Sequence, residues 1–178
     1  MSEDVKEKWL SYLAITMVIL AVCATLSTFK GGGFSTRAVL SQTQASDQWA
    51  FYQAKSIKSY LYEMQKEELE LALKTMDTKG SGPLSKQYRE KITSYNSKIK
   101  RYNEEKALIE KDAKKYESIK EDALKHSQSF GVAVIFLQIA ILLSSIAALM
   151  KMKYVWICGL VTGAAGIVYF ANGFFTIF

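Results

Sequence analysis

Three long stretches of this sequence carry no charged residue, and they limit the possible folds more than any other feature. They cover residues 9–29, 130–150 and 154–178, so each contains 21 to 25 residues. A helix rises about 1.5 Å per residue, so each stretch can cross the roughly 30 Å hydrocarbon core of a bilayer. Backbone polar groups in that core must bond within their own segment, which favours helices. The sequence therefore predicts three transmembrane helices.

The first stretch has an alternative interpretation as a cleaved signal peptide. Lys6 and Lys8 precede it, and Leu20-Ala21-Val22-Cys23 is similar to a lipoprotein cleavage site. Val22 is too large for the residue before such a cysteine, and the stretch is long for a signal sequence. We therefore expect a retained helix.

Residues 30–129 contain most of the charge, and their pattern predicts a helical hairpin outside the membrane. Gly31, Gly32 and Gly33 predict the end of the first helix, because consecutive glycines are costly in a helix interior. The segment Thr-Lys-Gly-Ser-Gly-Pro at 78–83 predicts a turn. The expected organisation has these parts: a tail at 1–8, helical arms at about 35–76 and 84–129, and a turn at 77–83.

Both arms repeat apolar residues in steps of three and four, the spacing of a coiled-coil seam. The stripe predicted for the first arm is Leu40, Thr43, Asp47, Ala50, Ala54, Ile57, Leu61, Met64, Glu68 and Leu71. The stripe predicted for the second arm is Tyr88, Ile92, Tyr95, Ile99, Tyr102, Lys106, Ile109, Ala113, Tyr116, Lys120, Ala123, Ser127 and Phe130. The expected fold is all-α, with three transmembrane helices and a long antiparallel coiled-coil hairpin. The second arm and the second span should form one continuous helix.

Small and polar residues in the spans predict how these helices pack. Gly159, Gly163 and Gly166 share one face of the third span, where small residues let helices approach closely. Gln138 and Asn172 are the most polar residues at depth. They indicate either hydrogen bonds between helices or a transport path. We favour the hydrogen bonds, because no ionisable residue accompanies these two.

Aromatic residues of the first arm occupy more than one helix face, and a hairpin covers only one. Trp49, Phe51, Tyr52 and Tyr62 are therefore predicted to contact another copy of the chain, because large exposed aromatic patches usually mark interfaces. The alternative is that these rings flank the hairpin seam.

Part of the sequence resembles a bacterial membrane family known only as domain of unknown function 4337. The resemblance is strongest in the first third, at Trp-Leu-Ser-Tyr-Leu-Ala (9–14), at Ala-Val-Cys-Ala-Thr-Leu-Ser-Thr-Phe-Lys-Gly-Gly-Gly (21–33) and at Gln-Ala-Ser-Asp-Gln-Trp-Ala-Phe-Tyr-Gln-Ala-Lys-Ser-Ile-Lys (44–58). It implies one span, a helical middle region and two closing spans. It implies no activity.

No pattern in the sequence indicates catalysis, a cofactor, a metal site or nucleic-acid binding. His126 is the only histidine, and the net charge of +6 is spread along the chain. The bilayer is the expected partner. Lys30 and Arg37, beside free glycine amides at the membrane surface, suggest a site for an anionic lipid phosphate. The alternative is a flexible joint with ordinary flanking cations.

The leading functional hypothesis is a non-enzymatic scaffold that assembles with further copies of itself through its hairpin and its spans. The alternative is a small channel or transporter accessory, in which symmetric packing of spans around an axis leaves a pore or path lined by Gln138, Ser144 or Asn172. The expected location is the bacterial inner membrane. Lys6, Lys8, Lys151 and Lys153 predict a cytoplasmic amino terminus and a periplasmic hairpin.

Overall fold

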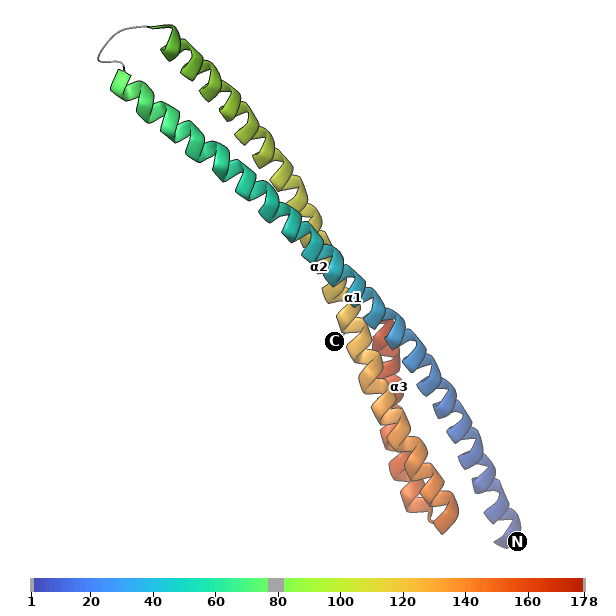
Figure 1. Ribbon diagram of the computed structural model, residues 1–178. Coiled ribbons are helices and arrows are strands. Elements are labelled where there is room, and N and C mark those ends of the chain that lie inside the picture. Colours follow the sequence, from blue (N-terminus) through green and yellow to red (C-terminus); the bar gives the residue numbers. More distant parts are fainter. Residues whose placement is uncertain (1, 77–81, 178) are drawn as a thin grey trace. The chain divides into compact units, whose positions relative to one another are not determined.

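The computed structural model describes residues 2–76 and 82–177. It contains three α-helices in this order: α1 (Ser2–Met76), α2 (Pro83–Met150) and α3 (Lys153–Phe175), shown in Figure 1. The described ranges contain no strand, so the all-α prediction is confirmed. Each helix includes a segment that is long and apolar enough to cross a membrane, judged by length and composition.

Helix α1 runs without a break through Gly31, Gly32 and Gly33, so the predicted helix end at this position is wrong. A glycine costs a helix interior only about 1 kcal/mol relative to alanine, and packing of the helix outweighs such a cost. A β-carbon on Gly31 would lie 3.1 Å from the β-carbon of Phe130 in α2. Ser127 Oγ of α2 donates a hydrogen bond to the Gly31 carbonyl at 3.1 Å. Gly31 therefore serves the close approach of two helices.

Helix α2 is continuous from Pro83 to Met150, which confirms that the second arm and the second apolar stretch form one helix. Proline fits the first turn of a helix because its missing N–H would have no partner there. The Ser85 amide and hydroxyl both donate to the Gly82 carbonyl, at 3.1 and 2.9 Å. Residues 77–81 of the predicted turn lie outside the described residues.

A tight connection joins α2 to α3. Lys151 adopts a left-handed conformation with φ of 55°, and the Met152 amide donates to the Ala147 carbonyl at 3.2 Å. Such a residue just after a helix satisfies carbonyls of the last turn and reverses the chain. Helix α3 can therefore return beside α2 with almost no linker.

The chain divides into two compact units, which we describe separately. The terminal unit consists of Met1–Leu40 and Ile119–Phe178, and the middle unit consists of Ser41–Ser118. Helices α1 and α2 contribute to both units, whereas α3 belongs to the terminal unit.

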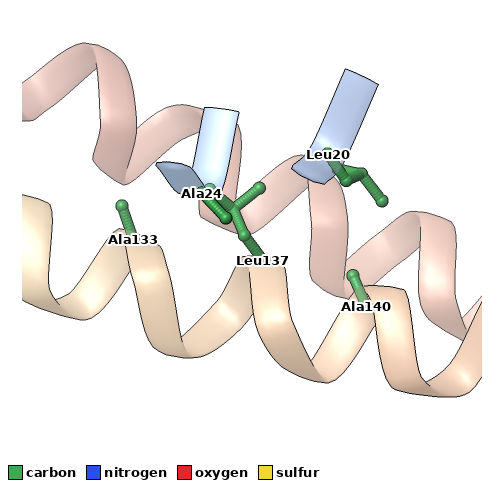
Figure 2. Close-up of a cluster of buried hydrophobic side chains, with 5 residues drawn as sticks. All are labelled: Leu20, Ala24, Ala133, Leu137 and Ala140. Carbon is green, nitrogen blue, oxygen red and sulfur yellow. The ribbon is translucent and has the colours of Figure 1, made fainter. Parts of the chain in front are cut away.

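Small residues dominate the core of the terminal unit. The buried cluster in Figure 2 combines Leu20 and Ala24 of α1 with three residues along one side of α2, namely Ala133, Leu137 and Ala140. A second cluster contains Trp9, Leu13 and Ala147. Alanine at these positions lets the helix axes come close together. Many short van der Waals contacts between the helices therefore hold them together, without large side chains between them.

The middle unit consists of two antiparallel helical segments. Trp49 Nε1 donates to Glu117 Oε1 at 2.8 Å, and Lys55 Nζ lies 2.5 Å from Glu105 Oε2. Further along α1, the ring of Tyr62 stacks on Tyr102 with ring centres 5.9 Å apart. Residues later in α1 thus contact residues earlier in α2, as expected for antiparallel helices.

The stripe predicted for the second arm faces inward, because all of its members are buried or half-buried. The stripe predicted for the first arm is wrong, because its members are all exposed, including Ile57 (60%) and Met64 (64%). The inward face of α1 in the middle unit is instead Ser41, Ala45, Gln48, Tyr52, Lys55, Ser59, Tyr62, Lys66, Leu69 and Leu73. Small residues such as Ser41, Ala45 and Ser59 fit there because α2 already supplies tyrosine and isoleucine side chains. Helix α1 therefore has two stripes with the same period, and the less apolar of the two packs against α2.

Replacement of Gly32 by alanine should stabilise the chain. A β-carbon on Gly32 meets no atom within 4 Å, so Gly32→Ala should raise the free energy of unfolding by about 0.5–1 kcal/mol through better helix propensity. Gly31→Ala is the matched control, because its β-carbon would crowd Phe130 and should cancel the gain. Circular dichroism during thermal unfolding in detergent measures both variants. A lower midpoint for Gly32→Ala would contradict a continuous α1.

Candidate interaction surfaces

Side chains that could bind a metal ion do not gather in the described parts of the chain. Among residues 2–76 and 82–177, no group of three or more His, Cys, Asp or Glu side chains is placed to hold a metal ion. Cys23 is half-buried and Cys158 is exposed, and both are free thiols. The candidate functional features of the described chain are therefore its exposed surfaces and the polar contacts between its helices.

Phe130 is the centre of a tightly packed junction in the terminal unit. Its side chain is fully buried, and its ring packs edge-on against Phe174 with centres 5.1 Å apart. A β-carbon on Gly173 of α3 would lie 2.7 Å from this ring, and Gly31 of α1 lies on another side of Phe130. Gly173 makes room for the ring and Gly31 for the β-carbon of Phe130, so all three helices meet at a single side chain.

Polar groups surround this junction and bond to each other. His126 Nδ1 lies 2.8 Å from the Gly173 carbonyl, which only accepts, so this nitrogen carries the hydrogen. The imidazole also stacks on Phe34 with ring centres 4.5 Å apart. Sequence reasoning missed this role, because His126 lies 47 residues from its carbonyl partner and no local pattern links them.

The two polar residues predicted to pack between spans differ in their surroundings. Asn172 is buried, its Nδ2 donates to Ser129 Oγ at 3.1 Å, and its Oδ1 accepts from the Ile177 amide at 2.7 Å. Gln138 is exposed, and none of the described residues forms a hydrogen bond with its side chain. The structure therefore does not place Gln138 among the helix contacts of a single chain.

The three glycines predicted to pack on the third span face other helices. A β-carbon would lie 3.1 Å from Ser144 Oγ at Gly159, 3.0 Å from Leu20 at Gly163 and 2.8 Å from Leu137 at Gly166. Ser144 is buried against Gly159. It does not share a helix turn with Gln138 or Asn172. The residues suggested for a path thus occupy separate surroundings and line no common channel in the described chain.

The aromatic residues predicted to contact another copy also separate into two groups. Trp49 bonds to Glu117, and Tyr52 packs edge-on against Trp49 with centres 5.5 Å apart. Tyr62 lies between Tyr95 and Tyr102 of α2. These three rings belong to contacts inside the middle unit. Only Phe51 is exposed, at 52%, where the Lys55 ammonium lies over its ring.

A different set of residues forms an exposed face on α1, which we call the outer stripe. It contains Thr43, Asp47, Ala50, Ala54, Ile57, Leu61, Met64, Glu68 and Leu71, and six of these nine are apolar. Ile57, Leu61, Met64 and Leu71 are each exposed by 53–66%. Tyr60, beside them, is exposed by 61%. Apolar side chains thus follow a helical spacing on the side of α1 that faces away from α2.

The corresponding outer face of α2 has the opposite character. Its exposed members are Gln87, Glu90, Ser94, Ser97, Arg101, Glu104, Leu108, Lys111, Lys115 and Ser118. Leu108 is the only apolar residue among them. Each outer face lies on the side of its helix opposite the contact between α1 and α2. Only the outer face of α2 has the polar composition of a solvated helix face.

Lys30 and Arg37 are both exposed on α1, and both line a groove that also includes Gly33 and Phe34. Residues 30–37 are helical, so their backbone amides donate hydrogen bonds within the helix. The prediction that free glycine amides contribute to a phosphate site is therefore wrong. Only the two cations of that hypothesis remain.

The three apolar segments and the helical middle unit define an all-helical protein with the composition of a membrane protein. The chain matches the family model described as "Domain of unknown function (DUF4337)" over residues 9–176, so it belongs to that family. No curated protein and no solved structure matches the chain.

Acid should weaken the Lys55–Glu105 pair. The hydrogen bond from Lys55 lowers the pKa of Glu105 below its ordinary value of 4.5. A carboxylate with a lowered folded-state pKa stabilises the fold above its unfolded pKa, and that stability is lost as the pH falls through the folded pKa. Glu105→Gln should therefore lower the unfolding midpoint at pH 7 and reduce its further drop between pH 5 and pH 3.

Glu104→Gln is the matched control, because Glu104 is the exposed neighbour on the polar face of α2. Thermal unfolding across this pH range measures each variant. Equal pH dependence in Glu105→Gln and the unsubstituted chain would show that the pair contributes nothing.

Proposed function

We propose that this protein is a non-enzymatic scaffold anchored in a membrane, which assembles with further copies of itself. In this proposal the three apolar segments cross the bacterial inner membrane, and the middle unit is a coiled-coil hairpin that carries contacts outside it. The family match supplies no activity, so the proposal depends on the physical character of the surfaces.

The outer stripe of α1 carries the proposal. Large apolar residues left in water cost free energy, and contiguous exposed apolar faces usually mark an interface. The polar outer face of α2 is an internal reference, because it belongs to the same unit and needs no cover. The contrast between them favours a partner that covers α1 alone.

A second copy is the partner that fits best. The outer stripe repeats in steps of three and four residues, and a helix that packs along it must follow the same rhythm. The helices of this hairpin have that rhythm. Assembly of several copies would bring their outer stripes together and leave the polar faces of α2 toward water.

The position of the polar residues favours a scaffold over a channel. Ser144 is enclosed against Gly159, Asn172 is bonded near the three-helix junction, and Gln138 is exposed on α2. The described chain thus offers no continuous polar path of its own. The polar groups that surround Phe130 hold helices together, which supports a structural role.

Charges on the outer stripe should separate the copies. Leu61→Glu with Met64→Glu adds two carboxylates to the middle of the stripe, so burial of this face becomes strongly unfavourable. We expect the particle mass in native-lipid nanodiscs to fall, because the contacts between hairpins are lost. Ser94→Glu with Ser97→Glu on the outer face of α2 is the matched control and should leave the mass unchanged.

Unchanged helix content by circular dichroism would show that the charged variants still fold. A single-chain mass for the unsubstituted protein in native lipid would remove the proposal. Equal effects of both pairs of substitutions would remove the role of the outer stripe.

The proposed orientation places the amino terminus in the cytoplasm and the hairpin in the periplasm. It relies on Lys6, Lys8, Lys151 and Lys153, because lysines in short loops favour the cytoplasmic side. In a chain without Cys23 and Cys158, Ser97→Cys should react with a membrane-impermeant maleimide on intact spheroplasts. Lys151→Cys should react only after lysis. The reverse result would invert the orientation.

A further inference from the structure

Gln138 has surroundings unlike those of the other polar residues in the apolar segments. Its position is about 12 Å along the helix from Phe130 and about 18 Å from Met150, near the middle of the apolar segment of α2. The side chain is exposed and has no hydrogen-bond partner among the described residues. A primary amide exposed to hydrocarbon without a partner costs several kcal/mol.

Other polar side chains of these segments have partners or are enclosed. Ser145 donates to the Ile141 carbonyl at 2.9 Å, Thr16 to the Leu13 carbonyl at 2.8 Å and Ser27 to the Cys23 carbonyl at 2.8 Å. Ser144 Oγ has no hydrogen bond, but it is buried between α2 and α3 and another molecule cannot reach it. Gln138 differs from these groups, because its amide is exposed and a partner outside the chain can reach it.

Gln138 is the centre of a face that has the form of a helix-packing surface. The face consists of Gly131, Ile135, Gln138, Leu142, Ser145 and Leu149, which follow each other in steps of four and three. Ile135 and Leu142 are exposed by 58% and 59%, and a β-carbon on Gly131 would meet nothing within 4 Å. The side of α2 that packs within the chain is a different one, formed by Ala133, Leu137, Ala140, Ser144 and Ala147.

We propose that α2 of a second copy covers this face, and that the Gln138 side chains of the two copies hydrogen-bond to each other within the membrane. The inference rests on the proposed membrane-anchored assembly and names its contact inside the bilayer. A primary amide has both donors and acceptors, so two identical glutamines satisfy each other. Copies inserted in the same direction place Gln138 at the same depth. Gly131 and Ser145 are small enough to let two helices approach.

Lipid is a poor occupant of this face, because an acyl chain offers neither a donor nor an acceptor to Gln138. A second copy satisfies the amide and also matches the seven-residue rhythm of the surrounding residues. Interhelical hydrogen bonds of this kind contribute modestly in membranes, so Gln138 should strengthen and orient the contact together with packing.

Disulfide cross-linking in native membranes tests the contact. In a chain with Cys23→Ala and Cys158→Ala, Leu142→Cys lies on the proposed face, and Val161→Cys, which replaces a residue of α3 exposed by 67%, is the control. Oxidation should link two copies through Leu142→Cys and not through Val161→Cys. Adding Gln138→Leu should reduce the association about three- to tenfold, whereas Gln138→Asn should retain most of it.

The outcomes separate this inference from the proposed function. An oligomeric particle that cross-links through Val161→Cys and not through Leu142→Cys overturns the Gln138 contact but keeps the scaffold. Equal cross-linking of Leu142→Cys with and without Gln138→Leu overturns the hydrogen bond between copies. A single-chain particle in native lipid overturns both proposals.

Discussion

Close approach of helices along faces of small residues is the constraint on which this structure depends. In the terminal unit, alanines of α2 and glycines of α3 leave no room for a larger side chain, and Phe130 fits only because Gly31 and Gly173 flank it. Such packing depends on many weak contacts at short distance, and it works in lipid, where burial of apolar surface gives no driving force between helices. The same closeness occurs at Gly31, the first of three consecutive glycines through which α1 stays helical.

In the middle unit, α1 packs against α2 with a face of only moderate apolar character, and its most apolar stripe is exposed. Serine, alanine, tyrosine and lysine occupy its inward face, and Lys55 is tolerated there because Glu105 and the rings of Phe51 and Tyr102 lie beside it. Isoleucine, leucine and methionine line the opposite side. An isolated hairpin would gain more by burying that side, and this contrast supports the proposed assembly in which both faces of α1 are covered.

Asn172 and Gln138 show how one physical rule gives two different outcomes. Both are amides in apolar segments, and in a bilayer both would need protein partners because lipid supplies none. Asn172 finds partners within its own chain, near the end of α3. Gln138 lies on the side of α2 opposite to the packed face and finds none in the described chain. Asn172 therefore stabilises its own chain, whereas the Gln138 amide is free for the contact that we propose with a second copy.

The sequence by itself determined the helical class, the three apolar segments, the continuity of α2 and the inward stripe of its second arm, because composition and period act locally. Only the tertiary structure decided which of two equally periodic stripes of α1 faces α2, since that choice depends on the side chains that α2 presents. It also decided that the helix continues through the glycines at 31–33, where Gly31 contacts Phe130 and Ser127, about a hundred residues away. His126 and Gln138 follow the same logic: a local pattern reveals that a polar residue is present, but only packing determines whether a partner lies within reach.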